Sequence, residues 1–322
     1  MNAASWRIPN GLSAVWATIL AIGIFCLPES PRFLYRMGRI QEARDIMARL
    51  NGVPSDSLLI DREVNEIEVQ QRVEADQGEA RLIEVFTGPR MLYRTILGMV
   101  LMGGQQLTGV NFFFYFGTTV FRATGISNSY ITAIILASVN VTATIVGLTF
   151  VEKVGRRKLL GFSALWMAAC FLVYTFVGTF ALNSTDPSKT PIAGALLIVF
   201  TCLFICAFAV SWGPLVWVVV SEMYPPRYRA PAMALATSAN WTLNFVISFT
   251  TTFVVAQIKY WYGLVFAVSC IGLALITYYF VNETIGRGLE EVDQMYLQKV
   301  SPRKSAAWRP EVGHVSEVAE RV

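Results

Sequence analysis

Three carboxamide side chains, Gln105, Gln106 and Asn111, lie in a stretch, residues 95–121, that contains no charged residue and is long enough to cross a bilayer. A buried amide without a hydrogen-bond partner costs about 1–3 kcal/mol, so these groups either pair with neighbouring helices or bind a ligand. Amides are neutral at every pH and carry both donors and acceptors. These residue types therefore favour a neutral, hydroxyl-rich ligand.

Other apolar stretches carry similar polar groups at helical spacing. Thr144 follows Asn140 at i+4, and five residues form one polar stripe at i, i+3, i+4, i+7 and i+11: Thr237, Asn240, Trp241, Asn244 and Ser248. The Gly213-Pro214 pair interrupts another stretch three residues before Trp217. The alternative for each amide is that it bonds a neighbouring helix and only holds the bundle together.

The geometry of the first stretch sets a condition on the site. On an ideal helix, Asn111 is about 120° from Gln105 and about 140° from Gln106 around the axis. The three amides converge only if the helix unwinds near Gly109, and the glycines at 103, 104 and 109 make bending cheap. A helix break at Gly109 is therefore predicted.

The composition requires a membrane protein. Hydrophobic residues make up 54% of the 322-residue chain, charged residues 15%, and the mean hydropathy is +0.50. Apolar segments that predict spans cover residues 11–27, 95–121, 130–151, 159–182, 191–221, 230–258 and 260–282. The fold class expected is an all-α membrane protein with four parts: a span (1–28), a helical linker (29–94), a six-span part (95–282) and a tail (283–322).

The basic residues indicate the orientation of these spans. Of the 26 Lys and Arg residues, 22 fall in the linker, the tail and alternate loops, and four fall on the other side. By the positive-inside rule the first group is cytoplasmic, so the C-terminus faces the cytoplasm and the first span starts outside. Because no signal peptide precedes that start, further upstream spans are expected.

The remaining features narrow the partners. His314, the single histidine, lies in the tail, the five cysteines lie in apolar segments, and no metal-ligand cluster appears in the sequence. No cofactor and no nucleic acid is expected, and the net charge of +4 is explained by loops near anionic lipid. Asn183, in an outer Asn-Ser-Thr sequon, is the one plausible glycosylation acceptor.

Several motifs, in order, resemble the sugar porters of the major facilitator superfamily, most closely fungal hexose transporters. The similarity covers the chain to about Tyr296. The runs that carry it are Pro28-Glu-Ser-Pro-Arg32, Gln105-Gln106 with Asn111, Val151-Glu-Lys-Val-Gly-Arg-Arg157, Gly213-Pro214 with Trp217 and Glu222, Asn240-Trp241 with Asn244, and Asn282-Glu-Thr-Ile-Gly-Arg287. In the last run, Asn282 and Ile285 replace the family's proline and lysine.

The resemblance implies the C-terminal six-helix half of the superfamily fold, preceded by its sixth span and the cytoplasmic linker. It implies that sugar hydroxyls bind Gln105, Gln106, Asn111, Asn140, Asn240 and Asn244. It also implies that the Trp217 ring covers one face of the sugar, in keeping with the apolar C–H face of a pyranose. Tyr115 resembles an outer gate, and the alternative for it is an aromatic core residue.

A second group of residues resembles a cytoplasmic gate of ion pairs. Its charged members are Glu152, Arg156, Arg157 and Glu222, with Arg227 or Arg229 as further partners, and Glu29 and Glu283 to Arg287 nearby. Such pairs would favour the outward-open state and break when the cytoplasmic side opens. The arginines alone are also explained by the positive-inside rule.

The function expected is hexose-like sugar transport in the plasma membrane by alternating access, without covalent chemistry. Proton symport is neither supported nor excluded, because no expected span holds an ionisable group. Two alternatives stay open: a sugar sensor that binds without turnover, and an inactive fragment. The facing N-terminal half, in the same or a separate chain, is an expected partner, together with the sugar and the bilayer.

Overall fold

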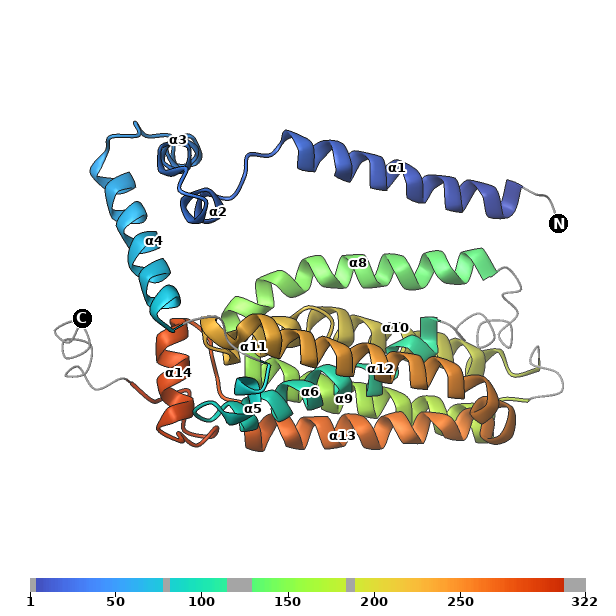
Figure 1. The fold of residues 1–322 in the computed structure, drawn as a ribbon. Helices are drawn as coiled ribbons and strands as arrows, with labels where there is room; N and C mark the ends of the chain where they lie inside the picture. Colours follow the sequence, from blue (N-terminus) through green and yellow to red (C-terminus); the bar gives the residue numbers. More distant parts are fainter. Residues whose placement is uncertain (1–3, 78–81, 115–128, 184–188, 310–322) are drawn as a thin grey trace. The chain divides into compact units, whose positions relative to one another are not determined.

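The computed structural model describes residues 4–77, 82–114, 129–183 and 189–309, and the chain divides into two compact units, 1–79 and 80–322 (Figure 1). Within these described ranges all regular secondary structure is helical. The two units are therefore treated one at a time.

The first unit holds four helices: α1 (Ala4–Cys26), α2 (Pro31–Arg36), α3 (Ile40–Asn51) and α4 (Leu58–Gln77). Proline at the first position starts α2, and Gly52 in the left-handed region ends α3. Residues 31–77, within the segment expected to be a helical linker, contain α2, α3 and α4. On α3, Ala43 and Met47 are buried in a small apolar core, whereas Ile40 and Leu50 are exposed.

The second unit contains the helices that carry the candidate site. They are α5 (Glu84–Thr87), α6 (Met91–Leu107), α8 (Ser129–Val154), α9 (Arg156–Phe176), α10 (Pro191–Val210), α11 (Leu215–Met223), α12 (Pro226–Ile258), α13 (Tyr262–Phe280) and α14 (Leu289–Leu297). A π-helical turn, Val177–Ala181, extends α9, and a 3₁₀ turn, Lys259–Trp261, joins α12 to α13. That turn contains Lys259 at φ +47, in the tight connection expected there.

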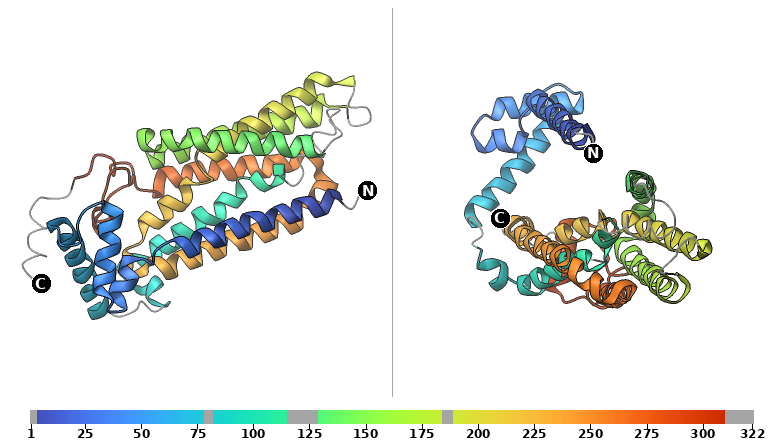
Figure 2. Two further views of the ribbon diagram at one scale, coloured as in Figure 1. Left: turned by 90° about the horizontal axis from the view of Figure 1, so that it is seen from above. Right: turned by 90° about the vertical axis from the view of Figure 1, so that its right-hand side faces the viewer.

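The long helices of this unit run side by side, with α5 and α14 at one end (Figures 1 and 2). The closest neighbours are α9 with α13, α6 with α12, and α10 with both α8 and α9. Aromatic rings fill the centre, where Phe113 stacks on Phe171 at a centroid distance of 4.8 Å and Phe204 lies 4.8 Å from Phe171. Such pairs stabilise the bundle beyond the area they bury.

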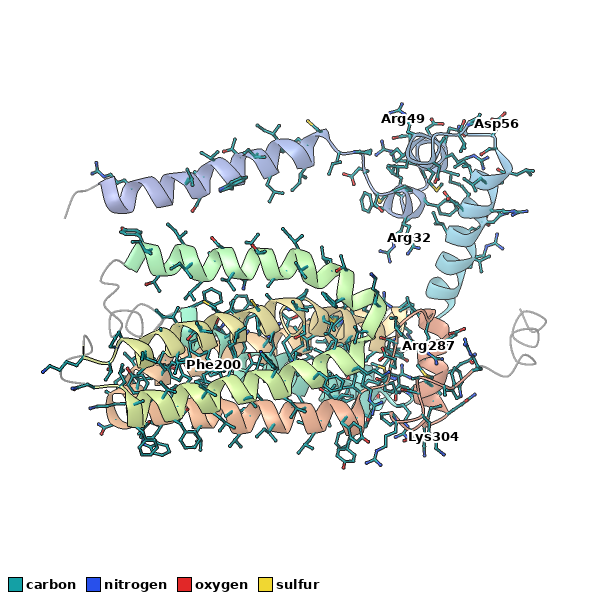
Figure 3. All side chains as sticks on the ribbon, turned by 180° about the vertical axis from the view of Figure 1, so that it is seen from behind. Arg32, Arg49, Asp56, Phe200, Arg287 and Lys304 are labelled. Atoms are coloured by element: carbon teal, nitrogen blue, oxygen red, sulfur yellow. The ribbon has the colours of Figure 1, made fainter. Side chains whose placement is uncertain are left out.

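By length and composition, four helical stretches of the described chain could cross a membrane: Tyr130–Val151, Arg156–Ala181, Pro191–Met223 and Pro226–Phe280. The third contains both α10 and α11, the fourth contains α12 and α13, and Gly11–Cys26 is a shorter apolar helix. Side chains change character along the unit: Phe200 lies midway along the bundle, whereas Arg287 and Lys304 lie at the end with α14 (Figure 3). Charged groups thus gather at the α14 end.

Candidate functional site

Helix α6 breaks where the sequence predicts it. The helix ends at Leu107, Gly109 has φ +85, and helical backbone resumes at Val110. A Cβ at Gly109 would lie 2.6 Å from Phe266 and 2.8 Å from Phe171, so both the backbone conformation and the space require glycine. The break re-aims the following turn, and with it Asn111.

The predicted interruption at Gly213-Pro214 is also present. Helix α10 ends at Val210 and α11 begins at Leu215, so the backbone carbonyls of Trp212 and Gly213 leave the helical ladder. Both accept hydrogen bonds from Gln105 Nε2, at 2.7 and 2.9 Å. The amide on the α6 side therefore satisfies the broken helix on the other side.

Asn240 is the centre of the arrangement. Its Nδ2 donates to the Met102 carbonyl at 2.6 Å and to Gln105 Oε1 at 2.8 Å, and its Oδ1 accepts from Gln106 Nε2 at 2.9 Å. Gln105 and Asn240 are only 5% and 3% exposed. One residue of α12 thus fixes both glutamines of α6, and all three side chains are satisfied in a low-dielectric interior.

Gln106 connects this buried pair to two more accessible amides. Its Oε1 accepts from Asn111 Nδ2 at 2.7 Å and from Asn244 Nδ2 at 3.2 Å. Asn111 and Asn244 are partly exposed. These side chains form one connected set, here called the amide cluster: Gln105, Gln106, Asn111, Asn240 and Asn244.

Other expected site residues lie outside this hydrogen-bonded set. Asn140 lies on α8, which packs on α10 and α9, and among described hydrogen bonds none links its amide to the cluster. Trp217 lies on α11, about one turn beyond the Gly213 carbonyl, and is 36% exposed. Tyr115 falls outside the described residues. Asn183 follows the π-helical turn, and its backbone N–H donates to Thr190 Oγ1 at 3.2 Å.

Two buried residues were missed by sequence reasoning. Trp212 is fully buried and donates from Nε1 to the Leu160 carbonyl at 3.0 Å, which anchors the helix break to α9. Arg94, 0% exposed, pairs with Asp293 of α14 at 2.6 Å and lies 4.7 Å from the Tyr296 ring. The tryptophan next to Gly213-Pro214 was a sequence signal for this contact, since a buried indole N–H requires an acceptor.

Burial beside Arg94 also affects Tyr296, because desolvation raises the pKa of this tyrosine above its usual range.

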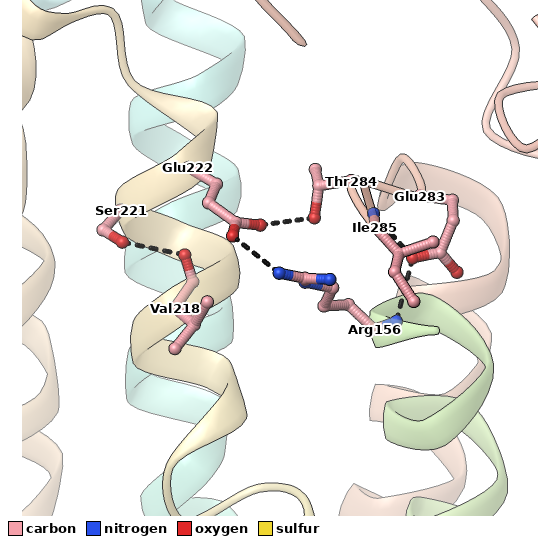
Figure 4. A network of polar contacts seen from close by, with 7 residues as sticks. All are labelled: Arg156, Val218, Ser221, Glu222, Glu283, Thr284 and Ile285. Carbon is pink, nitrogen blue, oxygen red and sulfur yellow. Dashed lines mark hydrogen bonds and ion pairs between the residues drawn. The ribbon is translucent and has the colours of Figure 1, made fainter. Parts of the chain in front are cut away.

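A second set of contacts joins the start of α9 and the end of α11 to the segment after α13 (Figure 4). Arg156, at the start of α9, pairs with Glu222 of α11 at 3.1 Å, and the Thr284 hydroxyl donates to the other Glu222 oxygen. The Glu283 carboxylate accepts the backbone N–H groups of Arg156 and Arg157 at 2.8 and 3.2 Å. We refer to Arg156, Glu222, Glu283 and Thr284 as the ionic cluster.

Glu283 lies at the N-terminus of α9, where backbone N–H groups are unpaired and the helix dipole favours negative charge. Gly155 leaves room for it: at φ +95, a Cβ there would lie 2.7 Å from Glu283 Oε2. Glu283 is 4% exposed, and the Ser305 hydroxyl accepts a hydrogen bond from the Glu283 backbone N–H at 2.9 Å. Glu283 thus holds the start of α9 through its side chain and the Ser305 hydroxyl through its backbone.

The partners of three predicted gate residues differ from expectation. Arg227 pairs with Glu84 of α5 at 2.8 Å rather than with Glu222, because α5 packs beside α12. Arg229 donates to the Tyr224 carbonyl at 3.3 Å, and Arg157 Nη2 donates to the Tyr278 carbonyl at 2.7 Å. The side chain of Glu152 lies outside the description, and Glu29 belongs to the first unit.

The chemistry available is neutral hydrogen bonding at the amide cluster and charge pairing at the ionic cluster. Within the described ranges, no group of three or more His, Cys, Asp or Glu side chains is placed to hold a metal. The amide cluster can exchange its mutual bonds for bonds to a ligand's hydroxyls, because each amide both donates and accepts.

Comparison with known proteins identifies the family of the chain. Residues 1–296 match the family profile described as "Sugar (and other) transporter". The high-affinity fructose transporter ght6 of Schizosaccharomyces pombe is 40% identical over 306 residues, or 95% of this chain and 57% of that protein. The low-affinity glucose transporter HXT1 of Saccharomyces cerevisiae is 41% identical over 312 residues, which are 96% of this chain and 55% of that protein.

Solved structures agree with the fold. The proton:xylose symporter XylE bound to 6-bromo-6-deoxy-D-glucose is similar with a TM-score of 0.68 and 27% identity, over 90% of this chain and 59% of that one. The inward-open xylose transporter XylE from E. coli gives a TM-score of 0.64 at 24% identity, over 92% of this chain and 59% of that one. The chain spans 55–57% of the length of the two yeast relatives described above. With its helix breaks, its fold and these relatives, the chain belongs to the sugar (and other) transporter family and has the all-helical fold of the C-terminal half of a major facilitator superfamily protein.

Proposed function

We propose that the amide cluster forms one wall of a binding site for a hexose-like sugar, in a transporter that works by alternating access. The observation that carries the proposal is the hydrogen-bonded chain from the Gly213 carbonyl through Gln105, Asn240 and Gln106 to Asn111. It joins two broken helices at mid-bundle, which is where transporters bind their substrates.

Within the cluster the depth of each amide suggests its task. Asn111 and Asn244 are partly exposed and both donate to one oxygen, Gln106 Oε1, so a sugar hydroxyl can replace either bond. Gln105 and Asn240 are buried deeper and bond backbone carbonyls. We assign direct sugar contact first to Asn111, Asn244 and Gln106. The exposed fraction of Trp217 makes its ring available to a sugar face.

We further propose that the ionic cluster acts as a cytoplasmic gate. It joins α9, α11 and the segment after α13, so α11 cannot move away from α9 without separating Arg156 from Glu222. Because α11 follows directly from the Gly213-Pro214 break, its movement and the arrangement of the amide cluster would be coupled.

Transport itself requires a second wall. In this proposal an N-terminal half, in the same or a separate chain, faces the amide cluster, the C-terminus lies in the cytoplasm, and the protein works in the plasma membrane. The relatives named above transport fructose, glucose or xylose according to their descriptions. A monosaccharide of that size is the proposed substrate, and coupling to protons is left out of the proposal.

The test is uptake of radiolabelled glucose and fructose into vesicles that contain these residues together with an N-terminal half. Gln106→Ala with Asn111→Ala should lower kcat/KM at least about 10-fold, since several hydrogen bonds of about 0.5–1.5 kcal/mol each are lost. The matched control is Thr149→Ala with Ser269→Ala, an exposed and a partly exposed hydroxyl whose described hydrogen bonds are to carbonyls of their own helices.

Unchanged uptake in the Gln106/Asn111 variant would remove the site assignment. A parent protein that binds glucose in calorimetry but shows no uptake would instead support the sensor alternative, because binding and turnover then separate. Equal losses in the control variant would point to general damage to the bundle and not to a lost sugar contact.

A further inference from the structure

A pair of tyrosines at the end of α13 is surrounded by arginines. The Arg157 guanidinium lies 5.1 Å from the centroid of the Tyr278 ring, and the Arg303 guanidinium lies 5.0 Å from the same ring and 4.7 Å from Tyr279. Tyr278 and Tyr279 are 50% and 49% exposed. We call these four residues the basic–aromatic patch.

Within the described ranges, no carboxylate pairs with the two arginines of the patch. The carboxylate nearest in the hydrogen-bond network, Glu283, is buried and accepts backbone N–H groups, including that of Arg157. Lys158 and Lys304, next along the chain to the two arginines, are exposed and add further charge. Two like charges beside one ring repel each other, and an anion bound by both would offset that repulsion.

An apolar surface leads to the patch. Exposed residues follow one side of α13 at i, i+3 and i+7 before Tyr278, namely Val268, Ile271 and Leu275. Helix α9, the closest neighbour of α13, exposes Phe162, Leu165 and Trp166 in its first half, which starts next to Arg157. This surface suits hydrocarbon chains, and tyrosines at its end suit the membrane–water interface.

We propose that the basic–aromatic patch binds the headgroup of an anionic phospholipid whose acyl chains lie along α9 and α13. The phosphate accepts hydrogen bonds from Arg157 and Arg303, whose guanidinium forks match its geometry. The two arginines are brought to Tyr278 from different segments, the start of α9 and the turn after α14, so a bound lipid joins these segments. The inference rests on the membrane embedding in the proposed function and does not depend on which sugar is carried.

The experiment is native mass spectrometry of the protein released from nanodiscs, titrated with phosphatidylserine or with phosphatidylcholine. Each basic residue near an anionic surface is worth about fivefold in affinity, so Arg157→Gln with Arg303→Gln should weaken phosphatidylserine binding about 25-fold. Arg303→Gln alone changes only an exposed side chain, so this single variant keeps the test valid if the double variant unfolds. Its phosphatidylserine binding should be about fivefold weaker than that of the parent. The matched control, Lys189→Gln with Lys259→Gln, removes two charges from loops outside the patch.

Selective loss of phosphatidylserine in the patch variants, with the control and phosphatidylcholine unchanged, supports the site. Equal binding by parent and Arg303→Gln, or equal losses in the control pair, overturns it. A competition with millimolar inorganic phosphate tests for a site that binds soluble anions. Displacement of phosphatidylserine by phosphate alone would show such a site and would also overturn the lipid proposal. Sugar uptake is measured separately, so failure here leaves the sugar site standing.

Discussion

The amide cluster and the ionic cluster both hold helices of one unit together, but they do it with opposite chemistry. The amide cluster uses neutral groups that bond one another and the carbonyls exposed at helix breaks. The ionic cluster uses charge, with one carboxylate on the N-terminus of α9 and another paired to Arg156. A neutral network can exchange partners at little net cost, whereas a buried charge must keep its partner.

In the proposed function, this difference separates binding from gating. Bonds in the amide cluster can be replaced one at a time by hydroxyls of similar strength, which suits a reversible site. Separating Arg156 from Glu222 leaves two partly buried charges unpaired, which suits a contact that is either made or broken. Variants of the two clusters should therefore respond differently to ligand and to salt.

The largest effect should come from the backbone that shapes the amide cluster. Gly109→Val places a β-branched residue at φ +85 and a Cβ against Phe266 and Phe171, so the free energy of unfolding should fall by about 3 kcal/mol. Asn111 would also lose its position beside Gln106. Unfolding in mixed detergent micelles measures the first effect, and glucose binding measures the second.

Gly272→Ala is the control for that prediction. A Cβ at Gly272, on α13, would meet nothing within 4 Å, so stability should be unchanged or rise slightly. If Gly109→Val kept both stability and binding, the break at residue 109 would not be what orients Asn111, and the contrast between the clusters would lose its structural basis.

A smaller effect is expected at the ionic cluster. Glu283→Gln keeps the shape but removes the charge from the N-terminus of α9 and turns an NH₂ group toward backbone donors, which should cost about 2 kcal/mol. Sugar binding should change little, because the Arg156–Glu222 pair that holds α11 to α9 is kept in this variant. Thermal unfolding and glucose titration of the same preparation measure both. A loss of binding without a loss of stability would contradict this separation.

Features that depend on backbone chemistry could be predicted from the sequence. Glycine at 109 and the Gly213-Pro214 pair predict the two breaks because only these residue types make such bends cheap. The convergence of Asn111 on Gln106 followed from helix geometry once the break was assumed. Of the polar stripe predicted on α12, Asn240 and Asn244 do meet α6, whereas Trp241 is 65% exposed.

Features that depend on which helices pack together could not be predicted from the sequence. Arg227 had Glu222 as a candidate partner along the chain, and only the position of α5 brings Glu84 to it. The central role of Asn240 depends on the Met102 carbonyl, and backbone acceptors leave no mark in a sequence. In the sequence, Arg94 is one of many basic residues of the linker, and only the position of α14 brings Asp293 to it. Tertiary placement, and not residue type, decides these contacts.

The smallest expected effect distinguishes the clusters most directly. A double-mutant cycle of Arg156→Gln and Glu222→Gln should give a coupling energy of about 1 kcal/mol at low salt, because both side chains are partly solvated. That coupling should fall toward zero by 1 M NaCl, where the Debye length is about 3 Å. The same cycle on Gln106→Leu and Asn240→Leu should give a coupling that salt leaves unchanged, since no charge is involved. Equal salt dependence in the two cycles would mean that the clusters do not differ in kind, and the assignment of binding to one and gating to the other would have to be given up.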